Sequence, residues 1–347
     1  MNSTTNLPLI SVIIPNHNGS RFLANCLSSL LLQTCRDMEI IVVDNASQDE
    51  SLETVRTIAP EAILLRQERN LGFAGAVNAG IQCSKGDWVA VLNNDTVVPT
   101  DWLAECARAI SEHPDAVFFA CRILDLADHT RVYSAGDCFL RAGIGYRRGQ
   151  EQSDRAEFRR ECRIFSASGC AAIYHKQTLE RIGALDERFF AYLEDVELGL
   201  RLQTAGCRGY YLPRAEVYHH GAGTSGGEFS RLAVRLRTRN SLLLLFKSLP
   251  GKLLFRCLPM IFLAQLSWIA RILAHIRLGS YLSGLGGALL LAPAMIRERS
   301  ALQPAWRSSG ERLWREILES ESLARTDFTG DHTDSRSIFL KLYFRLF

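Results

Sequence analysis

In the first 92 residues, short apolar runs alternate with segments whose apolar side chains recur at helical spacing. Residues 9–15 and 39–44 are apolar and rich in β-branched types, and residues 21–33 between them show helical spacing. The unit repeats, with predicted helices at 50–58 and 75–82 and predicted strands at 62–65 and 88–92. This alternation predicts an α/β fold, a mostly parallel sheet with helices on both faces. Ligands bind beyond the carboxyl ends of such strands, so the polar residues there are candidates for a site.

The pattern weakens in the middle of the chain. Residues 134–163 are rich in glycine and arginine and predict an irregular, variable excursion over the sheet. Regular structure is predicted again at 165–175 and in a helix that begins near Glu194 and ends at Gly206, a residue type suited to terminate a helix.

The C-terminal third contains two uncharged stretches, residues 257–270 and 278–296. The first is too short to span a bilayer, and the second is long enough but contains four glycines and Pro293. We interpret both as helices that lie in the membrane interface. A true membrane span and an ordinary soluble helical hairpin remain as alternatives.

The charge distribution supports an anionic partner for this part of the chain. Between Phe229 and Arg297 there is no acidic residue and there are ten basic ones, so the rest of a chain of net charge +3 carries −7. A membrane surface or nucleic acid fits such an asymmetry. Long apolar runs between the charges, without interleaved aromatics, favour lipid, and no nucleic acid is expected.

The cysteines and the N-terminus predict the cytoplasm. Ten cysteines are scattered without a Cys-x-x-Cys pair, which indicates reduced thiols. The first eight residues lack a basic region and lead into a strand, so no signal peptide is expected.

Two motifs indicate nucleotide binding. Asp44 ends a strand and is followed by turn-forming residues, and its carboxylate could accept the imide N–H of uracil or thymine; a purely structural turn is the alternative. The segment 70–80 contains small residues that allow close backbone approach. Asn70 and Asn78 within it are costly to bury without partners, which favours ligand contact.

Three further motifs indicate metal binding and catalysis. Asp95, after the predicted strand 88–92, could hold a divalent cation that neutralises a diphosphate, or belong to a polar turn. Glu194 and Asp195 begin a helix, where a carboxylate is either favourable helix chemistry or a general base. His219 and His220 precede a glycine-rich loop, and one imidazole could complete an oxygen-rich Mn²⁺ or Mg²⁺ site.

Together the five motifs resemble glycosyltransferase family 2, inverting enzymes of the A-type fold, and within it the rhamnosyltransferase-like branch that builds bacterial surface polysaccharides. The resemblance covers about residues 9–250 and implies a Rossmann-like sheet with a C-terminal helical, membrane-associating extension. It implies Asp195 as the catalytic base with Glu194 beside it, and Mn²⁺ or Mg²⁺ on Asp95 and His219, with His220 as the alternative. Asn93 stands where the family usually has the first acid of Asp-x-Asp. The implied substrate-binding residues are Pro15, Asn16, Asn18, Asp44, Asn70, Gly72, Asn78, Asn93 and Asn94.

The resemblance further implies a function. A catalytic domain of residues 1–240 would move a rhamnose-like deoxyhexose or other hexose from a UDP- or dTDP-linked donor to a glycan acceptor. The basic, apolar region 241–347 favours a polyprenyl-linked acceptor and a peripheral location on the inner face of the cell membrane. The alternative is an inactive glycan-binding or scaffold protein of the same fold. A nucleotidyltransferase is disfavoured, because only Arg21 follows the first glycine-containing loop.

Overall fold

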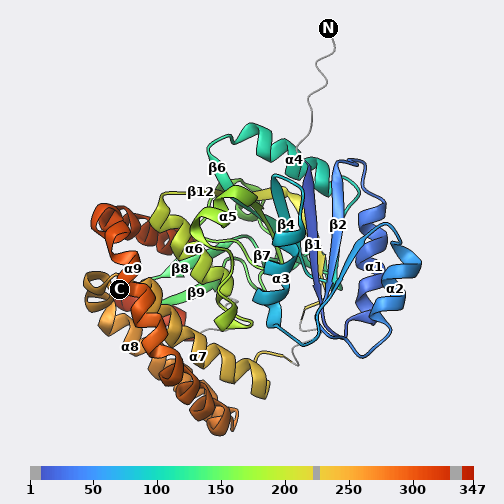
Figure 1. Ribbon diagram of the computed structural model, residues 1–347. Coiled ribbons are helices and arrows are strands. Elements are labelled where there is room, and N and C mark those ends of the chain that lie inside the picture. Colours follow the sequence, from blue (N-terminus) through green and yellow to red (C-terminus); the bar gives the residue numbers. More distant parts are fainter. Residues whose placement is uncertain (1–8, 222–226, 329–337) are drawn as a thin grey trace.

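The computed structural model describes residues 9–221, 227–328 and 338–347, apart from the side chains of residues 301 and 303–308 (Figure 1). Four parallel strands form one half of the main sheet, in the order β4-β1-β2-β3. They are β1 (Ile10–Asn16), β2 (Met38–Asp44), β3 (Ile63–Arg66) and β4 (Trp88–Leu92). The helices between them are α1 (Ser20–Leu31), α2 (Ser51–Ile58) and α3 (Gly72–Cys83), so the predicted repeat is confirmed.

Alternate residues of β1 belong to two different cores, one on each face of the sheet. Val12 and Ile14 pack in the core that contains Leu27 of α1, whereas Ile13 packs in the core that contains Val77 of α3. All five side chains are essentially inaccessible to solvent. Continuous apolar strands are required in a sheet that is covered on both faces.

The other half of the sheet is mixed, with parallel and antiparallel strands. β6 (Ala116–Asp125) and β12 (Arg208–His219) are parallel to each other, and β11 (Ala171–His175) lies antiparallel between β6 and β4. The predicted strand at 165–175 is thus confined to its last five residues. Short strands β5 (Thr96–Val97), β7 (Val132–Ser134) and β10 (Cys162–Arg163) pair along β12 and β6. The helices of this half are α4 (Trp102–Glu112), α5 (Lys176–Ile182) and α6 (Glu194–Ala205).

The prediction that residues 134–163 are irregular was wrong for much of the segment. It contains an antiparallel hairpin, β8 (Asp137–Leu140) with β9 (Ile144–Arg147), and a short 3-10 helix, η1 (Ala156–Arg159). Phe139 and Leu140 of β8 are fully buried in a third core, together with residues of the C-terminal helices. These contacts are distant in sequence, so local periodicity does not report them.

The C-terminal region is helical and packs against the sheet domain. It comprises α7 (Arg231–Ser248), α8 (Gly251–Ala274), α9 (Leu278–Arg325), the short 3-10 helix η3 (Thr326–Phe328) and α10 (Ile338–Leu346). α9 lies along α7 and also contacts α6 and β8. A Cβ added to Gly284 would lie 2.6 Å from the Arg235 carbonyl oxygen, so this glycine lets α7 and α9 approach closely. The predicted domain boundary at residue 240 falls inside α7.

Helices α8 and α9 have the length and composition of membrane-crossing helices over Gly251–Ala274 and Leu278–Ser300. Only 28% and 17% of the respective apolar windows are buried. Their large exposed side chains include Phe255, Phe262, Leu289 and Leu290, with exposed fractions of 65–84%. A broad apolar surface therefore lies on these two helices.

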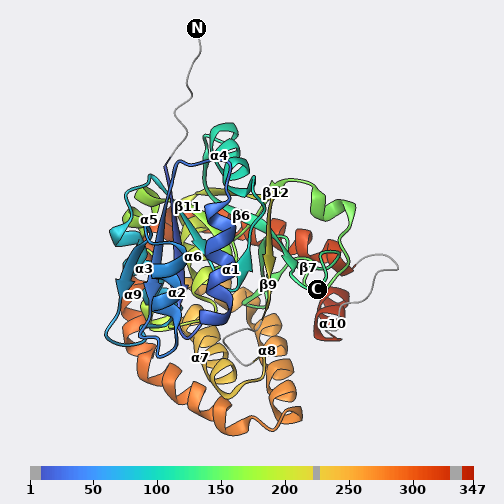
Figure 2. The same ribbon diagram turned by 90° about the vertical axis from the view of Figure 1, so that its right-hand side faces the viewer.

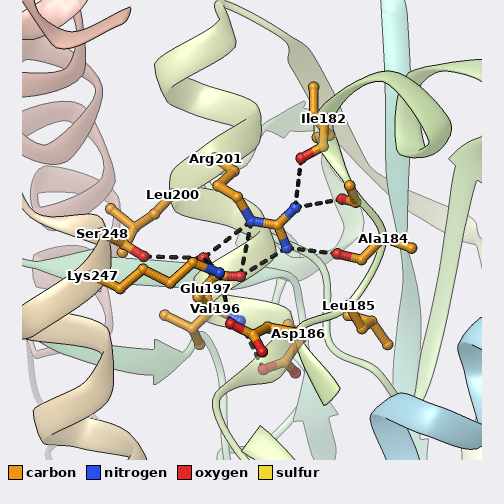
Figure 3. A network of polar contacts seen from close by, with 12 residues as sticks. Ile182, Ala184, Leu185, Asp186, Val196, Glu197, Leu200, Arg201, Lys247 and Ser248 are labelled. Atoms are coloured by element: carbon orange, nitrogen blue, oxygen red, sulfur yellow. Dashed lines mark hydrogen bonds and ion pairs between the residues drawn. The ribbon is translucent and has the colours of Figure 1, made fainter. Parts of the chain in front are cut away.

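A buried ionic network joins α6 to α7 and to the loop before η2 (Glu187–Phe189) (Figure 3). Glu197 has no exposed surface and pairs with Arg201 (Nη2–Oε2 2.7 Å) and with Lys247 (Nζ–Oε1 3.0 Å). The Lys247 ammonium also contacts Asp186 at 2.7 Å. Arg201 donates to the carbonyls of Ile182 and Ala184. Burial alone would raise the pKa of Glu197, but Arg201 and Lys247 lower it.

Replacing Lys247 with methionine should destabilise the protein by about 3 kcal/mol at pH 7, because it leaves part of a buried charge uncompensated. Urea denaturation measures the loss. The matched control is Lys252→Met, at an exposed position of α8, which should change stability by less than about 0.5 kcal/mol. Because the pKa of Glu197 is below its ordinary value of 4.5, the network should stabilise the wild type above that pH and weaken below it. Equal losses in the two variants would contradict the importance of the network.

Candidate functional site

The end of β12 places His219 beside Asp95. Thr96 in β5 is the register partner of His219 in β12, so the residue before β5 lies next to this histidine. His219 Nε2 is 3.1 Å from Asp95 Oδ1, and both side chains are buried. His220 is exposed and packs its ring against Phe22 instead, with 4.6 Å between the ring centroids. The structure therefore brings Asp95 together with His219 and directs the His220 ring elsewhere.

Asp95 and His219 could supply two of the ligands of a metal ion. Two adjacent ligands at about 2.1 Å from an octahedral ion lie about 3 Å apart, which agrees with the separation of these atoms. His219 Nδ1 is buried without a hydrogen-bond partner in the described structure, and the ring is held by an edge contact with Tyr133. No cluster of three or more His, Cys, Asp or Glu suited to a metal occurs among the described residues. The remaining ligands would have to come from substrate and water, a common arrangement for Mg²⁺ beside phosphates.

Predicted substrate-binding residues meet where β1, β2 and β4 end. Asn16 closes β1; its side-chain amide donates to Asp44 Oδ1 (3.4 Å) and to Ser47 Oγ (3.2 Å). Its oxygen accepts a hydrogen bond of 2.6 Å from Asn94, which follows β4 and precedes Asp95. Asn18 continues this edge and accepts from the Gln48 amide. Polar residues from three strand ends thus form one connected surface.

Asn45 links this surface to the start of α3. Its side chain donates to Asn70 Oδ1 (3.0 Å) and to the Gly72 carbonyl (2.9 Å), and it accepts from the Leu71 amide. Gly72 has φ +77°, and a Cβ there would collide with Phe190. Asn70 is exposed beside this bridge.

The remaining predicted substrate residues are held by backbone contacts. The side chain of Asn78 forms two hydrogen bonds with the backbone of Leu185, accepting from its amide and donating to its carbonyl. It also donates to the carboxylate of Glu187. These bonds assign Asn78 to the packing of α3 against the loop before η2. Pro15 lies in β1 opposite Val43, and the Asn93 amide donates to the Cys170 carbonyl.

Asp195 lies in the first turn of α6, directly after a strained loop. Phe190, Tyr192 and Leu193 all have positive φ, between 64° and 71°, which is unfavourable for residues of this size. Asn240 of α7 holds the loop by donating to the carbonyls of Phe189, Ala191 and Tyr192. Asn240 therefore ties the loop that precedes Asp195 to the C-terminal region.

The carboxyl groups of Asp137, Glu194 and Asp195 have pKa values that their surroundings shift in different ways. Burial raises the pKa of Asp195 above its ordinary value, and the Gly169 and Val196 amides, which donate to it at 3.0 and 2.8 Å, and the Arg147 charge only partly offset this. Burial and the Asp195 charge raise the pKa of Asp137 to about 8. They also raise that of Glu194, whose Oε2 has no partner in the described structure. Asp195 is therefore the carboxyl best supported in its ionised form.

Residues 169–170 connect Asp195 to the Asp95–His219 pair. The Gly169 amide donates to Asp195, and the next residue accepts from Asn93, two positions before Asp95. On the hairpin side, Arg147 lies 4.3 Å from the centre of the Tyr133 ring, which packs on His219. Asp95 and Asp195 are thus linked through residues 169–170, at the end of β4 where the antiparallel strand β11 begins. The sequence offered no signal for Tyr133, Asp137 and Arg147, because they lie in or beside the segment without periodicity.

Comparison with known proteins identifies the family. The family model described as "Glycosyl transferase family 2" matches residues 11–183. An N-acetylglucosaminyl-diphospho-decaprenol L-rhamnosyltransferase of Mycobacterium tuberculosis is 30% identical over 250 residues, which cover 63% of this chain and 78% of that protein. A PGL/p-HBAD biosynthesis glycosyltransferase of the same species is 36% identical over 110 residues, which cover 30% of this chain but only 43% of the relative. The chain belongs to glycosyltransferase family 2, as its motifs predicted.

Solved structures confirm the A-type fold. S. aureus TarS 1–349 in complex with UDP-GlcNAc superposes with a TM-score of 0.56 at 17% identity, covering 91% of each chain. GalNAc-T7 with UDP, GalNAc and Mn²⁺ gives 0.53 at 20% identity, covering 68% of this chain and 48% of that one. At these identities the likeness concerns the architecture alone, a mostly parallel sheet flanked by helices.

The raised pKa of Asp137 predicts how stability depends on pH. A carboxyl with a higher pKa in the folded state favours folding while it is protonated and opposes it as pH rises from its ordinary 3.8 toward about 8. Asp137→Asn removes this ionisation, so its melting temperature should match that of the wild type near pH 4 and exceed it by a margin that grows up to about pH 8. Asp115→Asn, at an exposed position, serves as the control. A constant difference between the Asp137 variant and the wild type at all pH values would contradict the shift.

Proposed function

We propose that this protein transfers a sugar, with inversion and with the help of Mn²⁺ or Mg²⁺, from a UDP- or dTDP-linked donor to a glycan acceptor. The observation that carries the proposal is the position of Asp195 at the same sheet edge as the Asp95–His219 pair. Similarity to a decaprenol-linked rhamnosyltransferase supports a rhamnose-like deoxyhexose or other hexose, a polyprenyl-linked acceptor and a role in cell-envelope polysaccharide synthesis. Residues 1–240 would form the catalytic part.

The chain's own residues divide the work between binding and proton transfer. Asp44 and the asparagines around it would hold the nucleotide, since an acid accepts the imide N–H of a pyrimidine. Asp195 would accept the proton of the attacking hydroxyl, because amide donors and Arg147 favour its charged form. A divalent ion held by Asp95 and His219 would neutralise the diphosphate leaving group. Attack in a single in-line step from the side of Asp195 would invert the anomeric centre.

Replacing Asp195 with asparagine should lower kcat by about 10²- to 10⁴-fold, because the proton acceptor is lost while the side-chain shape is kept. A thermal-shift screen of UDP- and dTDP-sugars identifies the donor, and transfer to a prenyl-diphosphate glycan is then measured. Nucleotide affinity should stay within about twofold, since Asp195 is not among the nucleotide contacts. Asp128→Asn, an exposed change, is the control. Near-normal turnover by the Asp195 variant would remove this residue from its role, and an inactive wild type would favour a binding protein.

The two neighbouring histidines provide a matched test of the metal site. His219→Ala should abolish the increase in UDP affinity that Mn²⁺ causes, because it removes an imidazole 3.1 Å from Asp95. His220→Ala, whose ring faces away, should retain that increase, and Asp95→Ala should behave like His219→Ala. Isothermal titration with Mn²⁺ and with EDTA measures the difference. A wild type that binds UDP equally well in both conditions would refute the metal assignment.

Residues 241–347 would hold the enzyme on the inner face of the cell membrane. The exposed apolar side chains of α8 and α9 lie in a region rich in basic residues, which suits an anionic lipid surface.

The double variant Leu289→Glu/Leu290→Glu should no longer float with vesicles containing phosphatidylglycerol, because it places charge on the apolar surface of α9. Leu32→Glu changes a leucine that is 65% exposed on the sheet domain and should float like the wild type. Flotation of the double variant at wild-type levels would refute this surface. A gel shift with DNA that exceeds vesicle binding would favour the nucleic-acid alternative.

A further inference from the structure

A cavity of about 670 Å³ lies between the nucleotide-binding edge and α7. One wall comes from the loop after β1 and from Asn70, and the opposite wall comes from α7. α7 lies below the carboxyl ends of β1 and β2 in both views (Figures 1 and 2). The polar groups that line it are contributed by His17, Asn18, Arg21, Asn70, Arg235 and Arg239. The cavity is therefore next to the proposed donor site but includes residues that the site does not use.

Two of the arginines lack a counter-ion. Arg235 and Arg239 are one turn apart on α7, and neither lies within ion-pair distance of a carboxylate in the part of the chain that the structure describes. Burial and then the charge of Arg235 lower the pKa of Arg239. Like charges at this helical spacing repel each other. The arrangement costs stability unless an anion occupies the cavity.

Arg239 is held in place, whereas Arg235 is free to adapt. The guanidinium of Arg239 donates to the carbonyls of Arg188 and Phe189, both at 2.8 Å, at the start of the strained loop before α6. Arg235 is exposed, and its backbone is closely packed against Gly284 of α9. Arg239 keeps the two N–H groups of Nη1 for an anion, because its Nε donates to Asn240 and its Nη2 to the two carbonyls. Arg235 can add its fork of donors, so the two guanidinium groups together can contact several oxygens of one anion.

We infer that this cavity binds the diphosphate group of a substrate, through Arg235 and Arg239. The inference rests on the proposed function, because both the nucleotide donor and a prenyl-linked acceptor carry a diphosphate. The volume exceeds the need of a single phosphate, and amides of Asn18 and Asn70 add neutral donors at the opposite wall. Leu232, Leu236 and Phe190 also line the cavity, so an apolar group attached to the diphosphate finds apolar contacts.

The test measures binding in EDTA, so that the Asp95–His219 pair contributes no metal. Isothermal titration of the full chain uses inorganic pyrophosphate, UDP and farnesyl diphosphate as separate probes. Arg235→Gln should weaken pyrophosphate binding about tenfold, because a charge-assisted bidentate contact is lost. Arg235→Lys should recover part of the affinity. Lys252→Gln removes an equal charge from an exposed position of α8 and should change it less than about twofold.

The two organic probes identify the source of the diphosphate. A loss with UDP as large as that with pyrophosphate assigns the cavity to the donor, and a loss confined to farnesyl diphosphate and pyrophosphate assigns it to the carrier lipid. Unchanged pyrophosphate affinity in Arg235→Gln overturns the inference. Because the measurement needs neither metal nor turnover, it is independent of the transferase assay. An inactive protein that binds pyrophosphate here would refute only the proposed function.

Discussion

The side chain of Asn16, at the end of β1, forms hydrogen bonds with residues at the ends of two other strands, β2 and β4. It is buried, and a buried amide without partners is costly, so its bonds to Asp44, Ser47 and Asn94 fix the relative positions of the loops after β1, β2 and β4. Asp95 follows Asn94 directly, and β5 then aligns it with His219. The geometry of the Asp95–His219 pair thus depends on the neutral side chain of Asn16.

The sequence predicted the first half of the fold well, because each of its elements has a clear periodicity. Strands β1 to β4 consist mostly of apolar residues, and the helices between them have one apolar face. The antiparallel direction of β11 and the hairpin β8–β9 could not be recognised in this way. Phe139 and Leu140 are buried against helices about 180 residues later in the chain, and nothing within the hairpin itself records that partner.

In the candidate site, too, some residues could be predicted from the sequence and others could not. Asp95, Asp195 and His219 were predicted as site residues because a family resemblance joined motifs that are individually ambiguous. The register of β12 with β5 then places His219, and not His220, beside the residue that precedes β5. For Asn78, the cost of burying an amide without partners predicted a ligand contact, whereas groups of the protein itself satisfy this side chain. Its partners are backbone groups of Leu185, which no local pattern could reveal. Arg147 and Asp137 depend on the hairpin and were missed with it.

Because Asn240 of α7 holds the loop before α6, the C-terminal helices limit how chains of this family can be recombined. The family match ends at residue 183, yet the loop that presents Asp195 is held by a side chain of α7, and α7 is in turn packed closely against α9. The C-terminal helices therefore cannot be exchanged between relatives as an independent module. In a chimera joined before α7, the loop that presents Asp195 would be held by the α7 of another protein, so the two parts are constrained to diverge together.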